Sequence, residues 1–273
     1  MKFFKMQGTG NDFIIIDDMN GELLGKEYET ARKLCDRHFG IGADGILLVR
    51  KSNIADIKMD IFNSDGSYAS MCGNGIRCFA KYVYEKKLVY KNTVHIETGD
   101  GIKAAKLKIS SNDKVTGISI NMGHPSFKPQ DIPALSDDEI VSKKINANGK
   151  DYIITSLFMG VPHTVVFEKI DDFDVKEGRD IEKFNIFPKG TNVNFCEVVS
   201  KDKIKVRTWE RGAGPTLACG TGCCASVCAC SRLNLTYKNV EVQIPGGTLN
   251  IEITSDGVMM TGPAEVCFAG EIL

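Results

Sequence analysis

Short runs of apolar residues, separated by polar turns that contain glycine, recur along the chain and predict a protein rich in β-strands. In the first half, segments rich in Ile and Val predict strands at 13–17, 46–49, 57–62, 94–98, 102–109 and 118–122. Residues 27–37 predict a helix. A second helix is predicted after Gly75, because apolar side chains recur at helical spacing from Ile76 to Tyr84.

The second half repeats this order of elements. Strands are predicted at 192–199 and 203–209, a helix at 222–233, and a hairpin at 240–253. Asn63 precedes Cys72 by the same number of residues as Glu210 precedes Cys219. This agreement indicates the duplication of a whole β-rich unit wrapped on one helix. We therefore predict an α/β fold of the α+β type, with two pseudo-symmetric domains and an active site in the cleft between them.

The repeat also suggests where the domains divide. We expect an N-terminal domain at 1–121 that carries Cys72, and a C-terminal domain at 122–263 that carries Cys219. The polar stretch 123–136 is the predicted crossover between them. Residues 264–273 are expected to return as a strand of the first domain.

Composition and charge narrow the classes of function. With 273 residues, 42% of them hydrophobic, the chain is large enough for a substantial core, and its formal net charge of −1 gives no reason to expect a nucleic acid or a membrane as partner. Residues 1–7 lack the apolar core and cleavage site of a signal peptide, which favours a cytoplasmic protein. The oligomeric state is left open, and a homodimer is one option.

Two motifs of the form Cys-Gly-x-Gly, at Cys72 and Cys219, each stand directly before a predicted helix. The N-terminus of a helix stabilises a thiolate through its dipole and its unpaired N–H groups. The glycines let the backbone approach a ligand closely, so that the N–H groups of Gly73, Asn74, Gly220 and Thr221 are expected to bind an anion such as an α-carboxylate. Two such thiols facing one pocket could take a proton from one side of a substrate and return it from the other.

The ten cysteines raise two further interpretations, a metal site and a thiol redox protein. Five of the cysteines cluster in the second half, at Cys219, Cys223, Cys224, Cys228 and Cys230. Their spacing lacks the Cys-x-x-Cys knuckles of zinc sites, and the residues between them are small, as on a helix packed against close neighbours. We therefore expect no metal ion and mostly buried thiols.

A glycine motif at 40–45 fits the dinucleotide fingerprint Gly-x-Gly-x-x-Gly. In that fingerprint the glycines follow a strand and open a helix, whereas here they follow a predicted helix and lead into a strand. Nucleotide binding is therefore not expected.

Other polar residues stand beside turns, where each has an ordinary structural explanation. Asn11, Asn63 and Asn192 could serve only to form turns, and Glu210 with Arg211 could be a surface ion pair. His163 follows a Gly/Pro turn at the head of a predicted strand at 164–167 and could be structural.

Taken together, these segments resemble one family, the diaminopimelate epimerases. The resemblance is carried by Lys5–Phe13, Ile61–Gly66, Cys72–Gly75, Trp209–Gly214 and Ala218–Gly222, and it continues through Pro245–Gly247 and Met260–Glu265. It implies two domains that each wrap a mixed β-barrel around a central helix. It also implies inversion of one stereocentre of 2,6-diaminoheptanedioate without a cofactor, which interconverts the LL and meso isomers for lysine and cell-wall synthesis.

The resemblance also implies roles for particular residues. Cys72 and Cys219 match the catalytic cysteines, and His163 and Glu210 match polar groups close to the thiols. The substrate-binding positions that match are Asn11, Asn63, Gly73, Asn74, Asn192, Glu210, Arg211, Gly220 and Thr221.

Two positions depart from the pattern of some members of this family. Gly45 stands where those have Gln, and Val161 stands where those have Asn. Loss of a hydrogen-bond donor at Val161 keeps a second hypothesis open, a racemase of another amino acid such as histidine or lanthionine on the same scaffold.

Overall fold

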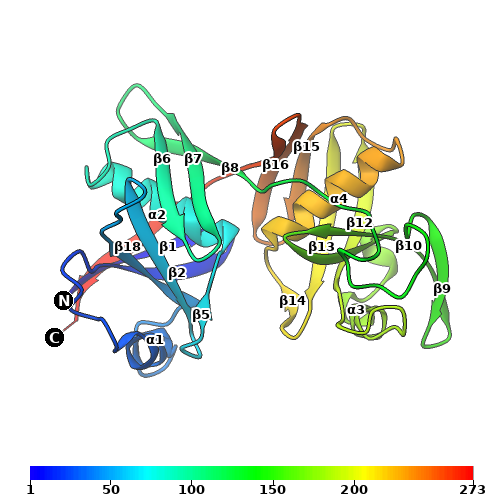
Figure 1. The fold of residues 1–273 in the computed structure, drawn as a ribbon, viewed down its shortest axis with the longest axis horizontal. Coiled ribbons are helices and arrows are strands. Elements are labelled where there is room, and N and C mark those ends of the chain that lie inside the picture. Colours follow the sequence, from blue (N-terminus) through cyan, green and yellow to red (C-terminus); the bar gives the residue numbers. More distant parts are fainter. Residues whose placement is uncertain (273) are drawn as a thin grey trace. The chain divides into compact units, whose positions relative to one another are not determined.

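The computed structural model describes residues 1–272, which divide into two compact units (Figure 1). The N-terminal unit contains residues 1–121 together with the chain from Thr261 onward, and the C-terminal unit contains residues 122–260. Both are mixtures of strands and a few helices, which confirms the predicted fold class.

The N-terminal unit has more residues in strands than in helices. Its strands are β1 (Lys2–Gly8), β2 (Asn11–Asp17), β3 (Gly45–Arg50), β4 (Ile57–Asn63), β5 (Tyr68–Ala69), β6 (Thr93–Thr98), β7 (Gly101–Ile109), β8 (Val115–Asn121) and β18 (Glu265–Glu271). The helices are α1 (Glu27–Cys35) and α2 (Gly73–Glu85). The predicted helix at 27–37 ends two residues early, because the side chain of Asp36 accepts hydrogen bonds from the backbone N–H groups of His38 and Phe39 and turns the chain.

The C-terminal unit has a closely similar list of elements. Its strands are β9 (Lys143–Ala147), β10 (Lys150–Met159), β11 (Val161–Phe167), β12 (Asn192–Ser200), β13 (Lys203–Glu210), β14 (Gly214–Thr216), β15 (Asn239–Ile244), β16 (Gly247–Thr254) and β17 (Gly257–Gly262), whose last two residues belong to the N-terminal unit. Its helices are the short η1 (Ile170–Asp172), η2 (Val175–Glu177) and α3 (Gly178–Glu182), and the longer α4 (Gly220–Arg232). The strand predicted to begin after His163 begins at Val161 instead, because the hairpin turn of β10 and β11 lies at Gly160, whose φ is 74°.

The pairing of the strands repeats between the two units. In the N-terminal unit, β1 and β2 are antiparallel, β2 and β3 parallel, β3 and β4 antiparallel, and β4 and β6 parallel. The corresponding strands β10, β11, β12, β13 and β15 pair with the same directions in the same order. β18 pairs antiparallel with β1 as β9 does with β10. The duplication predicted from the sequence is therefore present in the topology.

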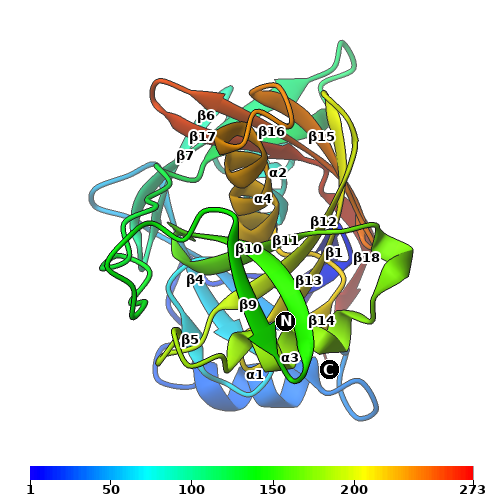
Figure 2. The same ribbon diagram turned by 90° about the vertical axis from the view of Figure 1, so that its right-hand side faces the viewer.

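Each unit packs its strands against one long helix. α2 contacts β1, β2, β3, β4, β7 and β8, and α4 contacts the corresponding β10, β11, β12, β13 and β16 (Figure 2). α2 buries the apolar positions that the sequence predicts, including Ile76, Phe79 and Val83. α4 is buried on nearly all sides, which its Ala, Ser, Val and Cys side chains permit because they are small.

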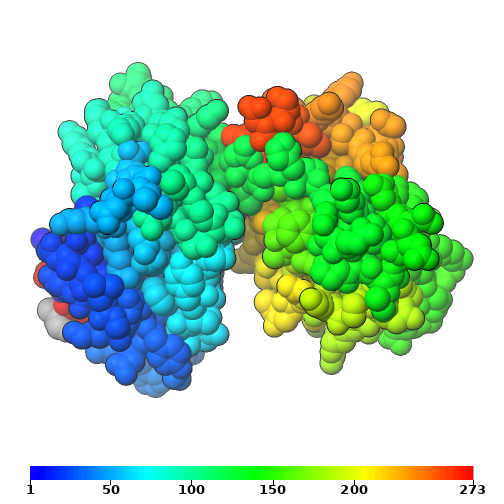
Figure 3. Space-filling model, in the orientation of Figure 1, coloured from blue at the N-terminus to red at the C-terminus, as the bar shows by residue number. Residues whose placement is uncertain are grey.

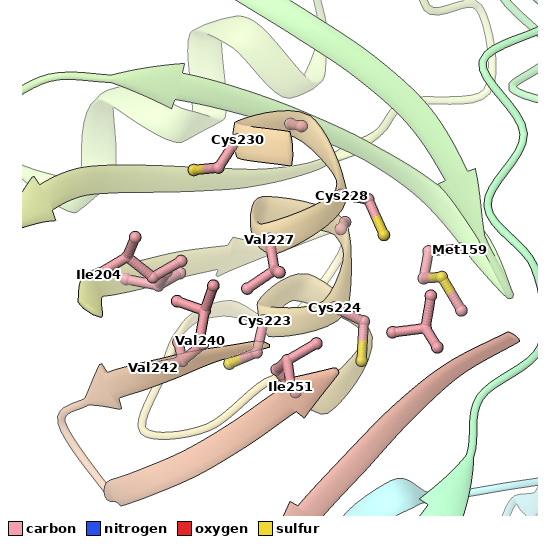
Figure 4. Packing of buried hydrophobic residues seen from close by; sticks show 14 of the residues in the cluster. Met159, Ile204, Cys223, Cys224, Val227, Cys228, Cys230, Val240, Val242 and Ile251 are labelled. Atoms are coloured by element: carbon pink, nitrogen blue, oxygen red, sulfur yellow. The ribbon is translucent and has the colours of Figure 1, made fainter. Parts of the chain in front are cut away.

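The cluster of cysteines on α4 belongs to the hydrophobic core of the C-terminal unit. Figure 4 shows these side chains among apolar neighbours from the surrounding strands, with Cys223, Cys224, Cys228 and Cys230 beside Val227, Val240, Val242, Ile204 and Ile251. The Sγ atoms of Cys196 and Cys230 lie 3.8 Å apart. Most of these thiols therefore pack as small apolar side chains.

The C-terminal end of the chain lies beside the N-terminal strand. Phe3 faces Gly270 and Phe4 faces Ala269 in the antiparallel ladder of β1 and β18. In the space-filling view, atoms of the C-terminal segment appear next to the first residues of the chain (Figure 3). None of the helices among residues 1–272 is long and apolar enough to cross a membrane.

A buried cluster of charges around Arg50 ties α1 to the strands of the N-terminal unit. The guanidinium of Arg50 lies 2.8 Å from Asp18, 2.8 Å from Glu27 and 2.9 Å from Asp60. All four side chains are at least 86% buried in this cluster. Burial raises the pKa of Glu27, but hydrogen bonds from the backbone and from Arg50 outweigh it and lower the pKa. Carboxylates held in this way depend on the one cation that they share.

We predict that Arg50→Met destabilises the protein by about 3 kcal/mol, because it leaves three buried carboxylates without their shared cation. The free energy of unfolding from urea titration measures this loss. Arg232→Met is the matched control, since Arg232 and Glu139 form a pair that is about half exposed, and removal of such a pair is expected to cost less than about 1 kcal/mol. Equal effects of the two substitutions would contradict the structural role of Arg50.

Candidate active site

Cys72 is the N-cap residue of α2, as its position before Gly-x-Gly predicts. Its backbone is extended, with φ −144° and ψ 118°, and its Sγ accepts a hydrogen bond from the backbone N–H of Gly75 at 3.4 Å. Sγ also donates to Oδ1 of Asn11 at 3.6 Å. The thiol therefore lies among the N–H groups of the first helical turn, where a negative charge on sulfur is stabilised.

Asn11 and Asn74 lie directly beside this thiol. The Nδ2 group of Asn74 donates to Oδ1 of Asn11 at 3.3 Å, and Nδ2 of Asn11 donates to Asp44 at 2.5 Å. The structure thus brings together three of the residues that the sequence singles out in the first half of the chain, Cys72, Asn11 and Asn74.

A group of charged side chains supports the side chain of Asn11 through its hydrogen bond to Asp44. Arg37 pairs with Asp12 at 2.8 Å and with Asp44 at 2.9 Å, and Lys5 pairs with Asp12 at 2.7 Å. Partial burial raises the pKa of Asp12, but the hydrogen bonds and charges of Arg37 and Lys5 outweigh it and lower the pKa to about 2. Asp12 therefore stays ionised at neutral pH and keeps Arg37 in place, which in turn positions Asp44 against Asn11.

Arg77 is a second supporting residue that the sequence analysis missed. It is fully buried on α2, and its guanidinium donates to Gly73 O at 3.0 Å, to Pro263 O at 3.1 Å and to Thr9 Oγ1 at 3.1 Å. It therefore ties the first turn of α2 to the β1–β2 turn that carries Asn11. Pro263 and Thr9 are distant from Arg77 in the sequence, so no local motif predicts these contacts.

Asn63 and Gly45 lie opposite each other on neighbouring strands of the N-terminal unit. Asn63 is the exposed last residue of β4, and its Nδ2 donates to Ser67 Oγ at 3.0 Å within the following turn. A Cβ atom added at Gly45 would lie 2.6 Å from the carbonyl oxygen of Phe62. The backbone at Gly45 is therefore adapted to glycine.

Cys219 occupies in α4 the position that Cys72 occupies in α2. It is the N-cap residue, with φ −123° and ψ 102°, and its Sγ lies 3.5 Å from Oγ1 of Thr221. Glu210, the last residue of β13, lies close by. Burial raises the pKa of its carboxyl, while its interaction with the thiol of Cys219 acts in the opposite direction. The second thiol thus has the carboxyl group of Glu210 as a neighbour.

Asn192 and Arg211 form one unit at the start of β12. Asn192 is buried, its Nδ2 donates to Pro162 O at 2.9 Å, and its Oδ1 accepts from the backbone N–H of Arg211 at 2.9 Å. The guanidinium of Arg211 donates to Lys189 O at 2.8 Å and stays exposed. Arg211 therefore has its backbone fixed while its cation remains accessible to an anion.

His163 lies inside β11 and not at its head, because the strand begins three residues earlier than predicted. The side chain is fully buried, and its Nδ1 lies 3.1 Å from Nδ2 of Asn194, a residue that the sequence analysis missed. Burial, with a smaller effect of the charge of Arg211, lowers the pKa of His163 to about 3. The imidazole is therefore neutral at physiological pH.

The first turns of α2 and α4 offer backbone N–H groups that have no partner within the helix. These belong to Gly73 and Asn74 in one unit and to Gly220 and Thr221 in the other. Gly160 lies beside the second of these turns, since a Cβ atom added there would be 3.8 Å from Cγ2 of Thr221. Val161, next in the chain, is half-buried at the start of β11.

Comparison with known proteins identifies the relatives of this chain. The family model described as diaminopimelate epimerase matches residues 3–128 and 155–267. A diaminopimelate epimerase of Clostridium perfringens is 59% identical over the whole length of both chains. One of Methanococcus maripaludis is 43% identical, over 100% of this chain and 99% of its own.

Solved structures with low sequence identity share the fold. A phenazine biosynthesis protein of the PhzF family from Bacillus anthracis superposes with a TM-score of 0.73 at 17% identity, and covers 100% of this chain and 99% of its own. A probable proline racemase from Agrobacterium radiobacter K84 superposes with a TM-score of 0.70 at 13% identity, with 100% and 92% coverage. The family model and the full-length relatives together show that this chain belongs to the diaminopimelate epimerase family.

Proposed function

We propose that this protein inverts one stereocentre of 2,6-diaminoheptanedioate and so interconverts its LL and meso isomers. The observation that carries the proposal is the equivalence of Cys72 and Cys219, each at the N-cap of the central helix of one repeated unit. The family membership supports the substrate, because the full-length relatives bear the name of this activity. A racemase of another amino acid, a redox protein and a metal-binding protein are not favoured.

The reaction needs a base on one face of the substrate and an acid on the other. In the proposed mechanism, one cysteine as thiolate takes the α-proton, which forms an S–H bond and leaves the electron pair on the α-carbon. The other cysteine as thiol gives its proton to the opposite face of that carbon and becomes the thiolate. The two sulfurs exchange protonation states in each turnover, so the reverse reaction uses the same pair with the roles exchanged.

Charge develops on the substrate carboxylate as the α-proton leaves. The N–H groups of Gly73 and Asn74, and those of Gly220 and Thr221, are the donors that we propose for this carboxylate. Such fixed donors stabilise the developing charge without a cofactor that delocalises it.

The remaining polar residues are proposed to select the substrate. Glu210 would pair with a substrate ammonium, and the exposed guanidinium of Arg211 with the distal carboxylate. Asn11, Asn63 and Asn192 would hydrogen-bond the substrate, and His163 would act close to the thiols. The supports already described for Asn11 and Arg211 keep these groups in fixed positions.

We infer that the protein works in the cytoplasm. The proposed mechanism needs one thiol and one thiolate, and a reducing compartment preserves both. An oxidising compartment would favour a disulfide and remove the base and the acid together.

We also infer that two copies of the chain associate through β18. β18 is exposed over most of its length, and its large apolar side chains Val266 and Phe268 are 45% and 49% exposed. Large apolar side chains exposed along one strand are typical of an association surface. We favour a second copy of the chain as the partner, because in a two-fold symmetric dimer β18 of one copy would contact β18 of the other.

The function is tested by incubation of LL-diaminopimelate in deuterated water. We expect product that carries one solvent deuterium, with little label in the recovered substrate at early times, because one thiol removes the proton and the other supplies the new one. Cys72→Ala and Cys219→Ala are each expected to abolish inversion, whereas Cys267→Ser, at an exposed thiol, leaves the rate unchanged. Mass spectrometry and chiral chromatography measure label and isomer.

Early and equal labelling of substrate and product would indicate one base for both faces and contradict the paired-thiol mechanism. Near wild-type inversion by either alanine variant would do the same. Lanthionine, histidine and proline are the substrate controls in this assay. Faster inversion of any of them than of LL-diaminopimelate would contradict the proposed substrate.

For the association, we predict that Phe268→Glu yields monomers, because a charge at the centre of the surface would be buried in the dimer. Sedimentation velocity measures the change. Tyr237→Glu is the matched control at another exposed aromatic side chain, in the C-terminal unit, and is expected to leave the dimer intact. A wild-type chain that is monomeric at micromolar concentration would refute this inference.

A further inference from the structure

The two repeated units differ sharply at one place, under the first turn of the central helix. In the N-terminal unit this turn packs at Gly75 against Leu47 and Phe13, at 3.3 and 3.4 Å from an added Cβ atom. In the C-terminal unit the equivalent Gly222 packs against Asn194 and Thr208, at 2.3 and 3.2 Å.

The strand registers show that these neighbours occupy equivalent positions. Leu47 pairs with Ile61 across β3 and β4, as Asn194 pairs with Thr208 across β12 and β13. Phe13 pairs with Gly45 across β2 and β3, as His163 pairs with Asn192 across β11 and β12. A polar triad of His163, Asn194 and Thr208 therefore stands where the other unit has the apolar triad of Phe13, Leu47 and Ile61.

Both triads are buried, with at most 5% of any residue exposed. The N-terminal unit demonstrates that apolar side chains at these positions are sufficient for this fold. Buried polar groups cost free energy unless they are hydrogen-bonded, and even then they stabilise a core less surely than apolar packing does. The fold alone therefore gives no reason for the polar triad.

The hydrogen bonds within the triad fix the orientation of the Asn194 amide. Its nitrogen lies 3.5 Å from the carbonyl oxygen of Thr164, which can only accept, and its oxygen accepts from the hydroxyl of Thr208 at 3.0 Å. The same nitrogen lies 3.1 Å from Nδ1 of His163 and donates its second hydrogen there. Nδ1 is then an acceptor, so the proton of the neutral imidazole is on Nε2.

The Nε2 atom of His163 is buried and has no hydrogen-bond partner among residues 1–272. A buried N–H group without a partner costs about 1–3 kcal/mol. This is the one position of the triad that its own hydrogen bonds leave unsatisfied, which points to a bound ligand as the partner. An N–H group of a neutral imidazole binds an anionic acceptor without adding a charge to the core.

We propose that Asn194, held by Thr208, is a positioning residue that fixes His163 as the neutral Nε2–H tautomer, so that His163 donates a hydrogen bond to an anion of the reaction and does not act as a base. This inference rests on the proposed function, because the anion is a thiolate or carboxylate of the epimerase reaction. The low pKa of His163 agrees with it, since an imidazole that stays neutral keeps its role throughout the physiological range.

The tautomer is measured directly by ¹⁵N NMR of the full-length protein labelled at its four histidines. We expect one histidine with a protonated Nε2 and an unprotonated Nδ1 from pH 6 to pH 8, assigned to His163 by its absence in His163→Gln. In Asn194→Asp the carboxylate would accept from the ring, so we expect the proton to move to Nδ1 or a doubly protonated ring. A wild-type His163 with Nδ1–H, or as imidazolium, overturns the proposal whatever the Asn194 variant shows.

Kinetics then test whether the fixed tautomer matters. Asn194→Asp and Thr208→Val are expected to lower kcat for LL-diaminopimelate by about 100-fold, as for loss of one oriented donor, with a smaller change in KM. Thr236→Val is the matched control, because it removes another buried hydroxyl of the same unit beyond the far end of α4. It is expected to leave both kcat and the His163 spectrum unchanged.

A swap between the units separates positioning from folding. The triple variant His163→Phe, Asn194→Leu, Thr208→Ile gives the C-terminal unit the apolar triad of the N-terminal one. We expect the Tm of this variant to equal or exceed that of the wild-type protein, and we expect its activity to be lost. Wild-type kcat in Asn194→Asp with an altered His163 spectrum would overturn the positioning role. Failure of the cysteine variants to lose activity would instead refute the proposed function and leave the tautomer result standing.

Discussion

The rest of the structure depends on the burial of one helix in each unit with a cysteine as its N-cap. Strands pack on nearly all sides of α2 and α4, and the first N–H groups of each helix have no partner within the helix itself. A thiol at that point is stabilised as thiolate by the same N–H groups that would hold a carboxylate. The chemistry therefore follows from where the helix begins.

Duplication explains why there are two thiols, and divergence explains why their surroundings differ. Equivalent positions carry Asn63 and Glu210, Asn11 and Val161, and Phe13 and His163. The polar groups that would recognise the substrate therefore differ between the two units, and neither unit repeats the set of the other. The site must hold one end of the substrate between the thiols and bind the other end away from them, which requires that asymmetry, whereas the proton transfers require only the matched thiols.

Local patterns were enough to predict the two helices that follow Cys72 and Cys219, since glycine turns and helical spacing act within a few residues, although α2 begins three residues and α4 two residues earlier than predicted. They also predicted two thirds of the strands, although β1, β5, β9, β10, β14 and β17 were missed and β11 began earlier than expected. The supporting residues could not be predicted in this way. Arg77 bonds to Pro263, and Asn194 bonds to His163, through contacts that only the folded strands bring together. His163 was placed at the head of a strand, and its Gly/Pro turn gives no information about its depth of burial.

The central claim is that the two thiols act on the same carbon from opposite sides, which requires that they approach each other. Mild oxidation followed by peptide mass spectrometry tests it most directly, because a disulfide forms only where Cβ atoms come within about 4.5 Å. The account predicts loss of activity together with a peptide that links Cys72 to Cys219, and recovery of activity when a reductant cleaves the link. Oxidised, inactive protein in which both cysteines are still alkylated as thiols would contradict it.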